Sequence, residues 1–463
     1  MSVPQTIKTE APTSIITVMI VMNRRLATAI LTFTLLSPLL YFVTCSVGAN
    51  AAGSVHNLNT GLSYTSIQNA IGAGETLGGH TIFVDAGTYN ENIVVNKQIR
   101  LIGEHPDSTV IKAADRTKNA LNITSDNVEI SGFNITGATQ WYPAACGLYL
   151  DSVSNVSISG NYVANNTYGI RMDYSSNNTL ANNKIWLNHF GINMYSDDDN
   201  NRIIKNSFSS HTGVSLSLWA GSDGNLVTQN AFFDNSDGVD IGYSNFNVIS
   251  YNNFSYNGLG IDIEQIGNNN TICHNNLIDN TGQAHSILGA ANFWDDGYPS
   301  GGNYWSNYAG VDAGNDGIGD APYTIDANNT DRYPLMGMFS DFNATSEYCV
   351  QTICNSSISG FQSNATSISF NVTGEDGTAG FCRVCTPSAL MNATYRVFVN
   401  GTEVQCNLLP CSNTTHSYLY FTYSHSTKEI VIIPELASLI ISPLLTIATL
   451  LATNVSRRKP FKR

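Results

Sequence analysis

Hydrophobic and polar residues alternate in short runs that recur along the middle of the chain. Each run starts with glycine and an aliphatic residue, and the second residue after that is again apolar. The glycines are spaced by 22, 22, 22, 25 and 22 residues, at Gly147, Gly169, Gly191, Gly213, Gly238 and Gly260. A period of two is typical of a β-strand, whereas a helix repeats every 3.6 residues. The pattern therefore predicts one strand per period, with one side turned to a core.

Asparagine marks two further strand signals in each period. One Asn precedes an apolar residue and is followed five positions later by Asn or His, as at Asn161 and Asn166. Another Asn, such as Asn178, stands before an apolar or β-branched pair. Glycine and asparagine tolerate left-handed corners, and stacked asparagine amides can hydrogen-bond along a solenoid.

Units of this length cannot bury their own apolar side, so successive coils must stack about 4.8 Å apart. We predict an all-β fold, a right-handed parallel β-helix with coils of about 22 residues over 52–340. A leucine-rich repeat is the competing solenoid, but its leucine-dominated consensus with one strand per unit does not occur in this sequence.

Charge and hydrophobicity argue against a nucleic-acid-binding protein and against a disordered chain. The 463 residues carry a net charge of −14 and only 12% are charged, which disfavours nucleic acid as a partner. With 42% hydrophobic residues and a regular period, the chain is expected to fold rather than to be disordered.

The N-terminal end carries a secretion signal. Arg24 and Arg25 precede an apolar run at 26–43 that is followed by small residues, so residues 1–51 are expected to be an N-terminal extension and a signal peptide. Met22 is a second candidate start, and an uncleaved N-terminal anchor is the alternative.

The C-terminal end, at 433–463, carries an anchor signal. Residues 436–455 are mostly apolar and uncharged, and a basic cluster follows them. This pattern predicts a single transmembrane helix with a cytoplasmic tail, while a buried core helix is the alternative. The bulk of the chain is then extracellular and tethered to the cell membrane. Glycosylation sequons, dense between Asn343 and Asn413, agree with that location.

Cysteines gather in the region 341–432, where alternating runs predict a small β-sandwich-like module. An even number of cysteines outside the cell predicts a module held by disulfides, although spacing does not give the pairing. A metal held around the Cys-X-X-Cys sequence is the alternative. The six residues are Cys349, Cys354, Cys382, Cys385, Cys406 and Cys411.

Two groups of motifs resemble a known family. TIFVDAGTY at 81–89 and IRLIGE at 99–104 resemble the opening coils of pectin-lyase-like β-helices, after a capping helix near 64–73. GNYWSNY at 302–308, followed by DGIGD and DRYPL, is similar to archaeal cell-surface members of the NosD family, which is named for a periplasmic copper-binding protein. The resemblance covers about residues 60–340 and implies the β-helix fold and an extracytoplasmic location.

The outward positions of the glycine-led strands should form two rows of side chains. Aligning the glycines places Tyr149, Arg171, Asn193, Ser215, Asp240 and Asp262 in the first row. The second row then holds Asp151, Asp173, Tyr195, Ser217, Gly242 and Glu264. An exposed strand carries polar residues in any case, so the rows alone do not establish a site.

Asp240, Asp262 and Glu264 are the candidate catalytic residues. Two carboxyl groups about 5 to 10 Å apart can hydrolyse a glycosidic bond, one as acid and the other as base or nucleophile. The residues assigned to saccharide binding are Tyr149, Arg171, Tyr195 and Trp219. The sequence therefore predicts binding of carbohydrate or of a cell-surface glycan, with a glycoside hydrolase or polysaccharide lyase as the alternative.

Metal binding is a further hypothesis. Asp312, Asp316 and Asp320 have part of the spacing of a calcium loop, although a glycine-rich turn would also explain them. His189 and His211 are one period apart and are the candidate copper ligands, but histidines at polar corners are commoner than metal sites, so copper is disfavoured.

Overall fold

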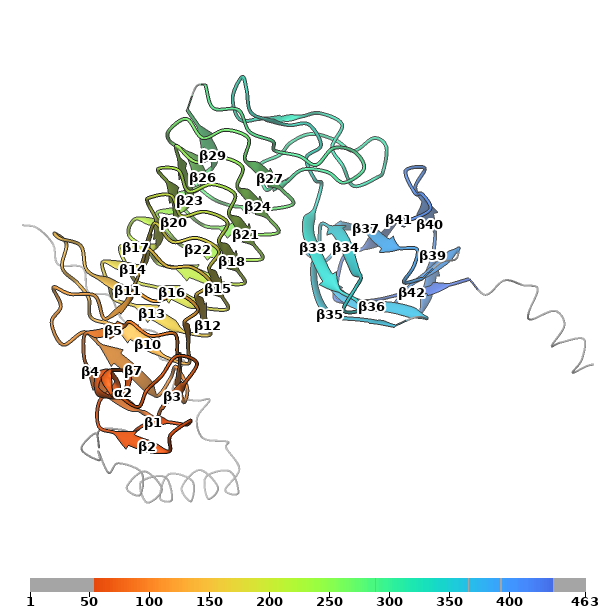
Figure 1. The fold of residues 1–463 in the computed structure, drawn as a ribbon. Coiled ribbons are helices and arrows are strands. Elements are labelled where there is room, and N and C mark those ends of the chain that lie inside the picture. Colours follow the sequence, from red (N-terminus) through yellow and green to blue (C-terminus); the bar gives the residue numbers. More distant parts are fainter. Residues whose placement is uncertain (1–53, 288, 365, 392–393, 436–463) are drawn as a thin grey trace, which may run out of the picture. The chain divides into compact units, whose positions relative to one another are not determined.

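The computed structural model describes residues 54–287, 289–364, 366–391 and 394–435 (Figure 1). The expected signal peptide and the expected transmembrane helix at 436–455 lie outside these residues. Within them, no helix is both long and apolar enough to cross a membrane.

Three sheets run along the solenoid, and each regular coil between its two ends contributes one strand to each of them (Figure 1). The eleven-stranded sheet has the order β2 (Leu62–Tyr64), β1 (Val55–Asn57), β3 (Thr81–Val84), β6 (Arg100–Gly103), β9 (Glu129–Ser131), β12 (Ser157–Ser159), β15 (Thr179–Ala181), β18 (Arg202–Ile204), β21 (Leu226–Thr228), β24 (Val248–Ser250) and β27 (Thr271–Cys273). Pairing is parallel from β3 onwards, as the predicted solenoid requires.

The other two sheets continue the same coils. The ten-stranded sheet has the order β30 (Tyr304–Trp305), β28 (Asn276–Ile278), β25 (Asn253–Ser255), β22 (Ala231–Phe233), β19 (Ser207–Ser209), β16 (Lys184–Trp186), β13 (Tyr162–Ala164), β10 (Asn134–Thr136), β7 (Thr109–Lys112) and β4 (Gly87–Asn90). The nine-stranded sheet has the order β29 (Gly282–Ser286), β26 (Leu259–Ile263), β23 (Asp237–Gly242), β20 (Val214–Trp219), β17 (Phe190–Met194), β14 (Tyr168–Asp173), β11 (Cys146–Asp151), β8 (Leu121–Ile123) and β5 (Ile93–Val95). The predicted all-β solenoid is confirmed.

The core consists of identical or similar side chains stacked on successive coils. Phe208, Phe232 and Phe254 stack with ring centroids 4.6 Å apart, which is the spacing of the coils. Ile170 and Ile192 lie opposite each other in the nine-stranded sheet and are fully buried. Each coil therefore hides its apolar side chains against those of its neighbours.

Asparagine ladders run along the corners between the sheets. In one ladder, Asn183 Nδ2 donates to Asn206 Oδ1 (3.0 Å), and Asn206 Nδ2 donates to Asn230 Oδ1 (3.1 Å). A second ladder includes Asn235 and Asn257, and a third includes Asn270. These ladders satisfy buried corner amides such as Asn206 N, and their Nδ2 atoms also donate to backbone carbonyls such as Ile158 O.

A short helix covers the first coils. Helix α2 (Ile67–Gly72) begins at Ser66, whose side chain accepts a hydrogen bond from Asn69 N. The Glu91 carboxylate accepts from Ile67 N and Gln68 N, which stabilises the helix N-terminus. Its buried residues close the end of the solenoid core, as the sequence predicted.

The chain after the solenoid forms two antiparallel sheets with a shared buried cluster. One sheet has the order β33 (Met338–Asn343), β34 (Cys349–Cys354), β37 (Ala379–Pro387), β41 (His416–Ser424) and β40 (Cys406–Leu408). The other has the order β35 (Ser357–Asn364), β36 (Ser367–Thr373), β42 (Lys428–Pro434), β38 (Tyr395–Val399) and β39 (Thr402–Val404). A small hairpin of β31 (Tyr323–Thr324) and β32 (Thr330–Asp331) precedes them. Val350, Phe370 and Val384 belong to the shared cluster.

One disulfide joins two strands of this region. Cys354 in β34 lies opposite Cys382 in β37, with a Cα to Cα distance of 4.4 Å, so their sulfur atoms can bond. The predicted six-cysteine framework differs from the structure at the other four positions, where Cys349, Cys385, Cys406 and Cys411 are free thiols. The strand register explains part of this difference, because Cys385 is opposite Gln351 and Cys406 is opposite Phe421.

Candidate functional site

The outward face of the nine-stranded sheet holds the predicted rows, with one correction. The structure pairs Asn193 with Ser217 and Ser217 with Asp240, so Ser215 does not belong to the first row. Trp219, rather than Ser217, follows Tyr195 in the second row. The glycine alignment failed at this coil because Ser215 occupies the position that glycine has in its neighbours.

Close approach of the coils explains that glycine position. A Cβ atom on Gly169 would lie 2.6 Å from the carbonyl oxygen of Gly191, and one on Gly191 would lie 2.3 Å from that of Ser215. Gly213 lies two residues before this contact, so it is not the counterpart of Gly191. Leu216 and Leu218 fill the inward positions that the alignment gave to Val214 and Leu216.

The N-terminal part of the face contains the ion pair of Arg171 and Asp173 beside tyrosine rings. Tyr149 Oη donates to Asp173 Oδ2 at 2.7 Å, and Arg171 Nη2 pairs with the same oxygen at 3.0 Å. Burial raises the pKa of Tyr149, and its hydrogen bond to Asp173 raises it further. The Arg171 guanidinium lies 5.7 Å from the centroid of the Tyr168 ring. The structure thus brings two of the four predicted binding residues together.

A surface hollow beside Arg171 was not predicted. It has a volume of about 380 Å³ and is lined by Trp141, Tyr142, Tyr168 and Arg171, among others. Trp141 is 62% exposed and Tyr142 is 86% exposed. Both belong to the connection between β10 and β11, which is longer than the connections in the following coils. We call this feature the Trp141 hollow.

The sequence did contain a signal for this hollow. Residues 137–145 separate β10 from β11, whereas only residues 165–167 separate β13 from β14 in the next coil. An aromatic pair within an insertion on a solenoid marks a feature that the repeat itself does not need. Alignment of the repeats discards such insertions, which is why these residues were missed.

The C-terminal part of the face is acidic. Asp240 in β23 lies opposite Asp262 in β26, and Glu264 follows two residues later. The pKa of Asp240 is raised to about 7, mainly by burial; the hydrogen bond from Trp219 lowers it, and the nearby Glu264, Asp262 and Asp237 carboxylates add smaller upward contributions. Asp262 Oδ1 lies 2.7 Å from His285 Nδ1. The three predicted carboxylates therefore come together.

An aromatic row borders the acidic part and consists of Tyr195, Trp219 and Tyr243. The Tyr195 and Trp219 rings are stacked with centroids 6.4 Å apart, and Tyr243 meets Trp219 edge-on at 6.3 Å. Trp219 reaches over Gly242, where a Cβ atom would come within 2.6 Å of the indole. This position lets Trp219 Nε1 donate to Asp240 Oδ2 at 2.7 Å. Tyr195 and Tyr243 are about half exposed.

The side chains of the three predicted calcium ligands accept hydrogen bonds from backbone amides of their own loop. Asp312 Oδ2 accepts from Gly317 N at 2.8 Å, and Asp320 Oδ2 accepts from Ala313 N at 2.8 Å. Asp316 Oδ1 accepts from Ile318 N at 3.0 Å. Across the described parts of the chain, no three His, Cys, Asp or Glu residues are grouped so that they could hold a metal ion. These hydrogen bonds stabilise the glycine-rich turn, and calcium binding at this loop stays a prediction.

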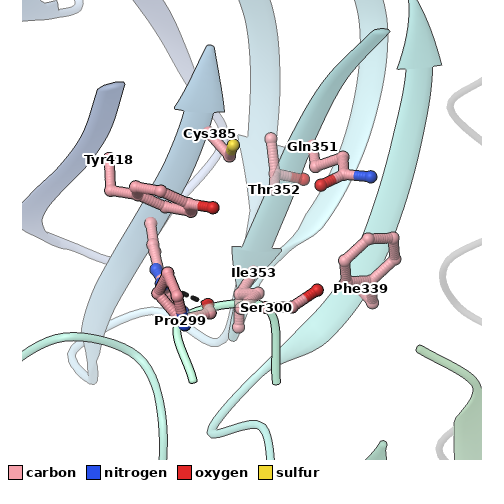
Figure 2. Close-up of a pocket in the computed structure, with 9 residues that line it drawn as sticks. Pro299, Ser300, Phe339, Gln351, Thr352, Ile353, Cys385 and Tyr418 are labelled. Atoms are coloured by element: carbon pink, nitrogen blue, oxygen red, sulfur yellow. Dashed lines mark hydrogen bonds between the residues drawn. The ribbon is translucent and has the colours of Figure 1, made fainter. Parts of the chain in front are cut away.

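A small cavity near the end of the solenoid is no candidate site (Figure 2). Pro299, Ser300, Arg383 and Tyr418 are among the residues that line it, and Arg383 Nη2 donates to Pro299 O at 2.7 Å. Its volume of about 20 Å³ has room for about one water molecule. A sugar ring does not fit there, so the outward face of the nine-stranded sheet remains the candidate site.

Comparison with known proteins gives a family match and relatives that are similar over short segments. The family described as "Periplasmic copper-binding protein (NosD)" matches residues 75–242 and 234–310, which together are about half of the chain. A "Cell surface glycoprotein" of Methanothermus fervidus is 38% identical over 133 residues, which are 29% of this chain and 21% of the relative. A "Probable ABC transporter binding protein NosD" of Stutzerimonas stutzeri is 38% identical over 88 residues, 19% of each protein. The chain thus spans about a fifth of the length of these relatives.

Among solved structures, the chain is similar to an alginate lyase from Paenibacillus sp. str. FPU-7. It has a TM-score of 0.38 and 18% sequence identity, and the match covers 51% of this chain and 94% of the lyase. This likeness bears on neither substrate nor activity.

The copper named in the family description does not fit the histidines of this chain. His211 takes the place of an asparagine in the second ladder, and its Nδ1 atom faces Asn188 N at 3.3 Å. His189 Nδ1 instead faces Thr212 Oγ1 at 2.8 Å. Met172 and Met194 are adjacent but fully buried in the apolar core. His211 Nε2 is buried and has no hydrogen-bond partner within the part of the chain that the structure describes, but one nitrogen does not make a ligand set.

Proposed function

The chain belongs to the NosD family, and we propose that it is displayed outside the cell, where it binds saccharide along the outward face of its nine-stranded sheet. The observation that carries this proposal is the Trp141 hollow, in which exposed aromatic rings stand beside Arg171. Sugars present apolar faces and polar edges, so they suit a surface that offers both rings and charged hydrogen-bond donors.

The aromatic row extends the same surface along the solenoid. Tyr195, Trp219 and Tyr243 come from three successive coils, and each coil advances the face by about 4.8 Å. A saccharide chain lying parallel to the axis meets one coil after another, so several sugar units can be contacted at once. This repetition favours an extended polysaccharide over a free monosaccharide.

Location at the cell surface is supported by three features. A relative is named "Cell surface glycoprotein", and residues 1–51 have the pattern of a secretion signal. Sequon asparagines Asn155, Asn177 and Asn269 are exposed at corners of the solenoid, where an enzyme can reach them. We further propose that residues 436–455 anchor the protein in the membrane. Fusion of a reporter to the C-terminus, followed by protease treatment of intact cells, tests that anchor.

A binding screen tests the proposed function. The full-length protein is applied to a panel of oligosaccharides, and the Trp141→Ala, Tyr142→Ala double variant is compared with Tyr256→Ala. Tyr256 is 58% exposed at a corner beyond the ten-stranded sheet, so its loss should leave binding unchanged. Loss of the two rings should weaken binding at least about tenfold, or ~1.4 kcal/mol. Equal affinities for all three proteins would refute the proposal.

Hydrolysis of a bound saccharide is a second candidate function, favoured by the raised pKa of Asp240. A carboxyl group with a pKa of about 7 holds a proton that it can give to a leaving glycosidic oxygen. Asp262, on the neighbouring strand, would then activate water or attack the sugar. A reducing-sugar assay of wild type and Asp240→Asn tests this: the variant should lose turnover and retain binding. Absence of turnover by wild type on every bound saccharide would exclude hydrolysis.

A further inference from the structure

The acidic end of the face has more negative groups than its protein partners neutralise. It comprises the carboxyl groups of Asp237, Asp240, Asp262 and Glu264. Among the described residues, Asp262 alone of these four forms an ion pair, with His285. Burial raises the pKa of Glu264, and the neighbouring Asp262 and Asp237 raise it further. The exposed Glu264 carboxylate is therefore repelled by the other carboxylates of the group.

Asp240 has one carboxyl oxygen atom without a hydrogen-bond partner among the described residues. The residue is only 6% exposed, and its Oδ2 atom accepts the hydrogen bond from Trp219. Its Oδ1 atom is buried and has no partner in the described chain. Leaving a buried carboxylate oxygen unpaired costs free energy, so a donor from a ligand or a water molecule is required there.

The aromatic row gives this acidic end a second property. Tyr195 and Tyr243 are exposed, and the half-buried Trp219 ring lies between them, directly beside Asp240. An aromatic face attracts a cation and also accepts the apolar face of a sugar ring. A ligand that suits both groups has a sugar ring and a positive charge.

We infer that the acidic end binds amino sugar units, with the ammonium group among Asp240, Asp262 and Glu264 and the sugar ring against the aromatic row. This inference rests on the proposed saccharide-binding function and adds the chemical class of the ligand. A polymer of uronic acids is disfavoured at this end, because its carboxylates would approach four carboxyl groups of which, among the described residues, only Asp262 has an ion-pair partner.

The two ends of the face therefore differ in what they select. At the N-terminal end, Arg171 and Asp173 neutralise each other, and the exposed rings of the Trp141 hollow provide most of the contact. At the acidic end, the uncompensated carboxylates provide the selection. A glucosamine polymer has an ammonium group on every unit, so it can present one to the acidic end in any register.

Calorimetric titration of the full-length protein tests the inference with four probes. They are a tetramer of β-1,4-linked glucosamine, its fully N-acetylated counterpart, a tetramer of galacturonic acid, and tetralysine. The glucosamine tetramer should bind at least about tenfold more tightly than the N-acetylated tetramer, because charge-assisted hydrogen bonds are the stronger ones. Asp240→Asn and Glu264→Gln should each reduce that preference. Glu264 is exposed, so its variant keeps the test valid if Asp240→Asn folds poorly.

Asp107→Asn is the matched control, since it removes one negative charge from a side chain that is 69% exposed in an early coil. It should leave the preference unchanged. Equal binding of the two glucosamine-based tetramers, or tighter binding of galacturonate, would overturn the inference while the proposed function stands. Tetralysine binding as tightly as the amino sugar would overturn the saccharide assignment of this end. No binding of any saccharide would overturn the inference together with the proposed function.

Discussion

Removal of one ladder asparagine should destabilise the solenoid far more than removal of an exposed one. Asn230 is 1% exposed, and its Nδ2 atom donates to Ile203 O at 2.8 Å and to Asn252 Oδ1 at 3.0 Å. Its Oδ1 atom accepts from Asn206 N at 2.8 Å. Substitution Asn230→Ala therefore leaves the buried backbone donor Asn206 N without the acceptor that it has in the structure, whereas Ile203 lies within β18 and belongs to the strand ladder.

The expected cost follows from the unpaired Asn206 N–H group. A buried polar group left unpaired costs about 1 to 3 kcal/mol, so the variant should lose about that much stability. The control is Asn96→Ala, because Asn96 is exposed just after β5 and its side chain has no hydrogen bond among the described residues. The guanidinium midpoint of unfolding, followed by circular dichroism at the β-sheet band, measures the difference. A midpoint for Asn230→Ala equal to that of Asn96→Ala would refute the ladder as a source of stability.

Three further predictions concern the coil contact and the acidic end. Gly191→Val should prevent correct stacking of the coils, because a Cβ atom at this position would lie 2.3 Å from Ser215 O. The control is Gly72→Ala, which has open space around it and should leave the melting temperature unchanged. Asp240 has a pKa of about 7 when folded and about 3.9 when unfolded, so its contribution to stability falls as pH rises from about 4 to about 7. The melting temperature of Asp240→Asn relative to wild type should therefore increase between pH 5 and pH 8, and a constant difference would contradict this sign. Trp219→Phe keeps a ring but removes the hydrogen bond that lowers the pKa of Asp240, so carboxyl NMR should find that pKa still higher.

The fold was predictable because the repeat appears directly in the sequence. Inward positions such as Ile170 and Ile192 follow a period of two, and each coil must place them against the next. The corner asparagines were predicted to stack, and the hydrogen bonds from Asn183 to Asn206 confirm it. Both features follow from a local pattern that repeats from coil to coil. The sequence shows such a repeat without any knowledge of contacts between residues far apart in the chain.

The candidate site was predictable only in part, because it depends on coil length. Asp240 and Asp262 are in consecutive regular coils, and the alignment placed them correctly. The coil before them is irregular, so the alignment gave Ser215 a position that belongs to Ser217. Trp219 was assigned to sugar stacking, but its hydrogen bond to Asp240 across Gly242 could not be derived from spacing.

The disulfide and the metal hypotheses show the limit of spacing arguments. Cys354 and Cys382 are joined because their strands place them directly opposite, a fact of register that no count of cysteines provides. The spacing of Asp312 and Asp316 resembles a calcium loop, and in the structure one oxygen of each accepts a hydrogen bond from a backbone amide of the same turn, so calcium binding there stays a prediction. The domain boundaries near residues 340 and 432 stay predictions.

Hydroxyl-radical footprinting of the full-length protein with and without a saturating oligosaccharide tests the central claim most directly. If saccharide lies on the outward face of the nine-stranded sheet, then Trp141, Tyr142 and Tyr195 should lose reactivity when it binds. Phe233 and Tyr256, exposed on and beside the ten-stranded sheet, should react as before. Protection of Phe233 and Tyr256 with unchanged Trp141 and Tyr142 would contradict the account.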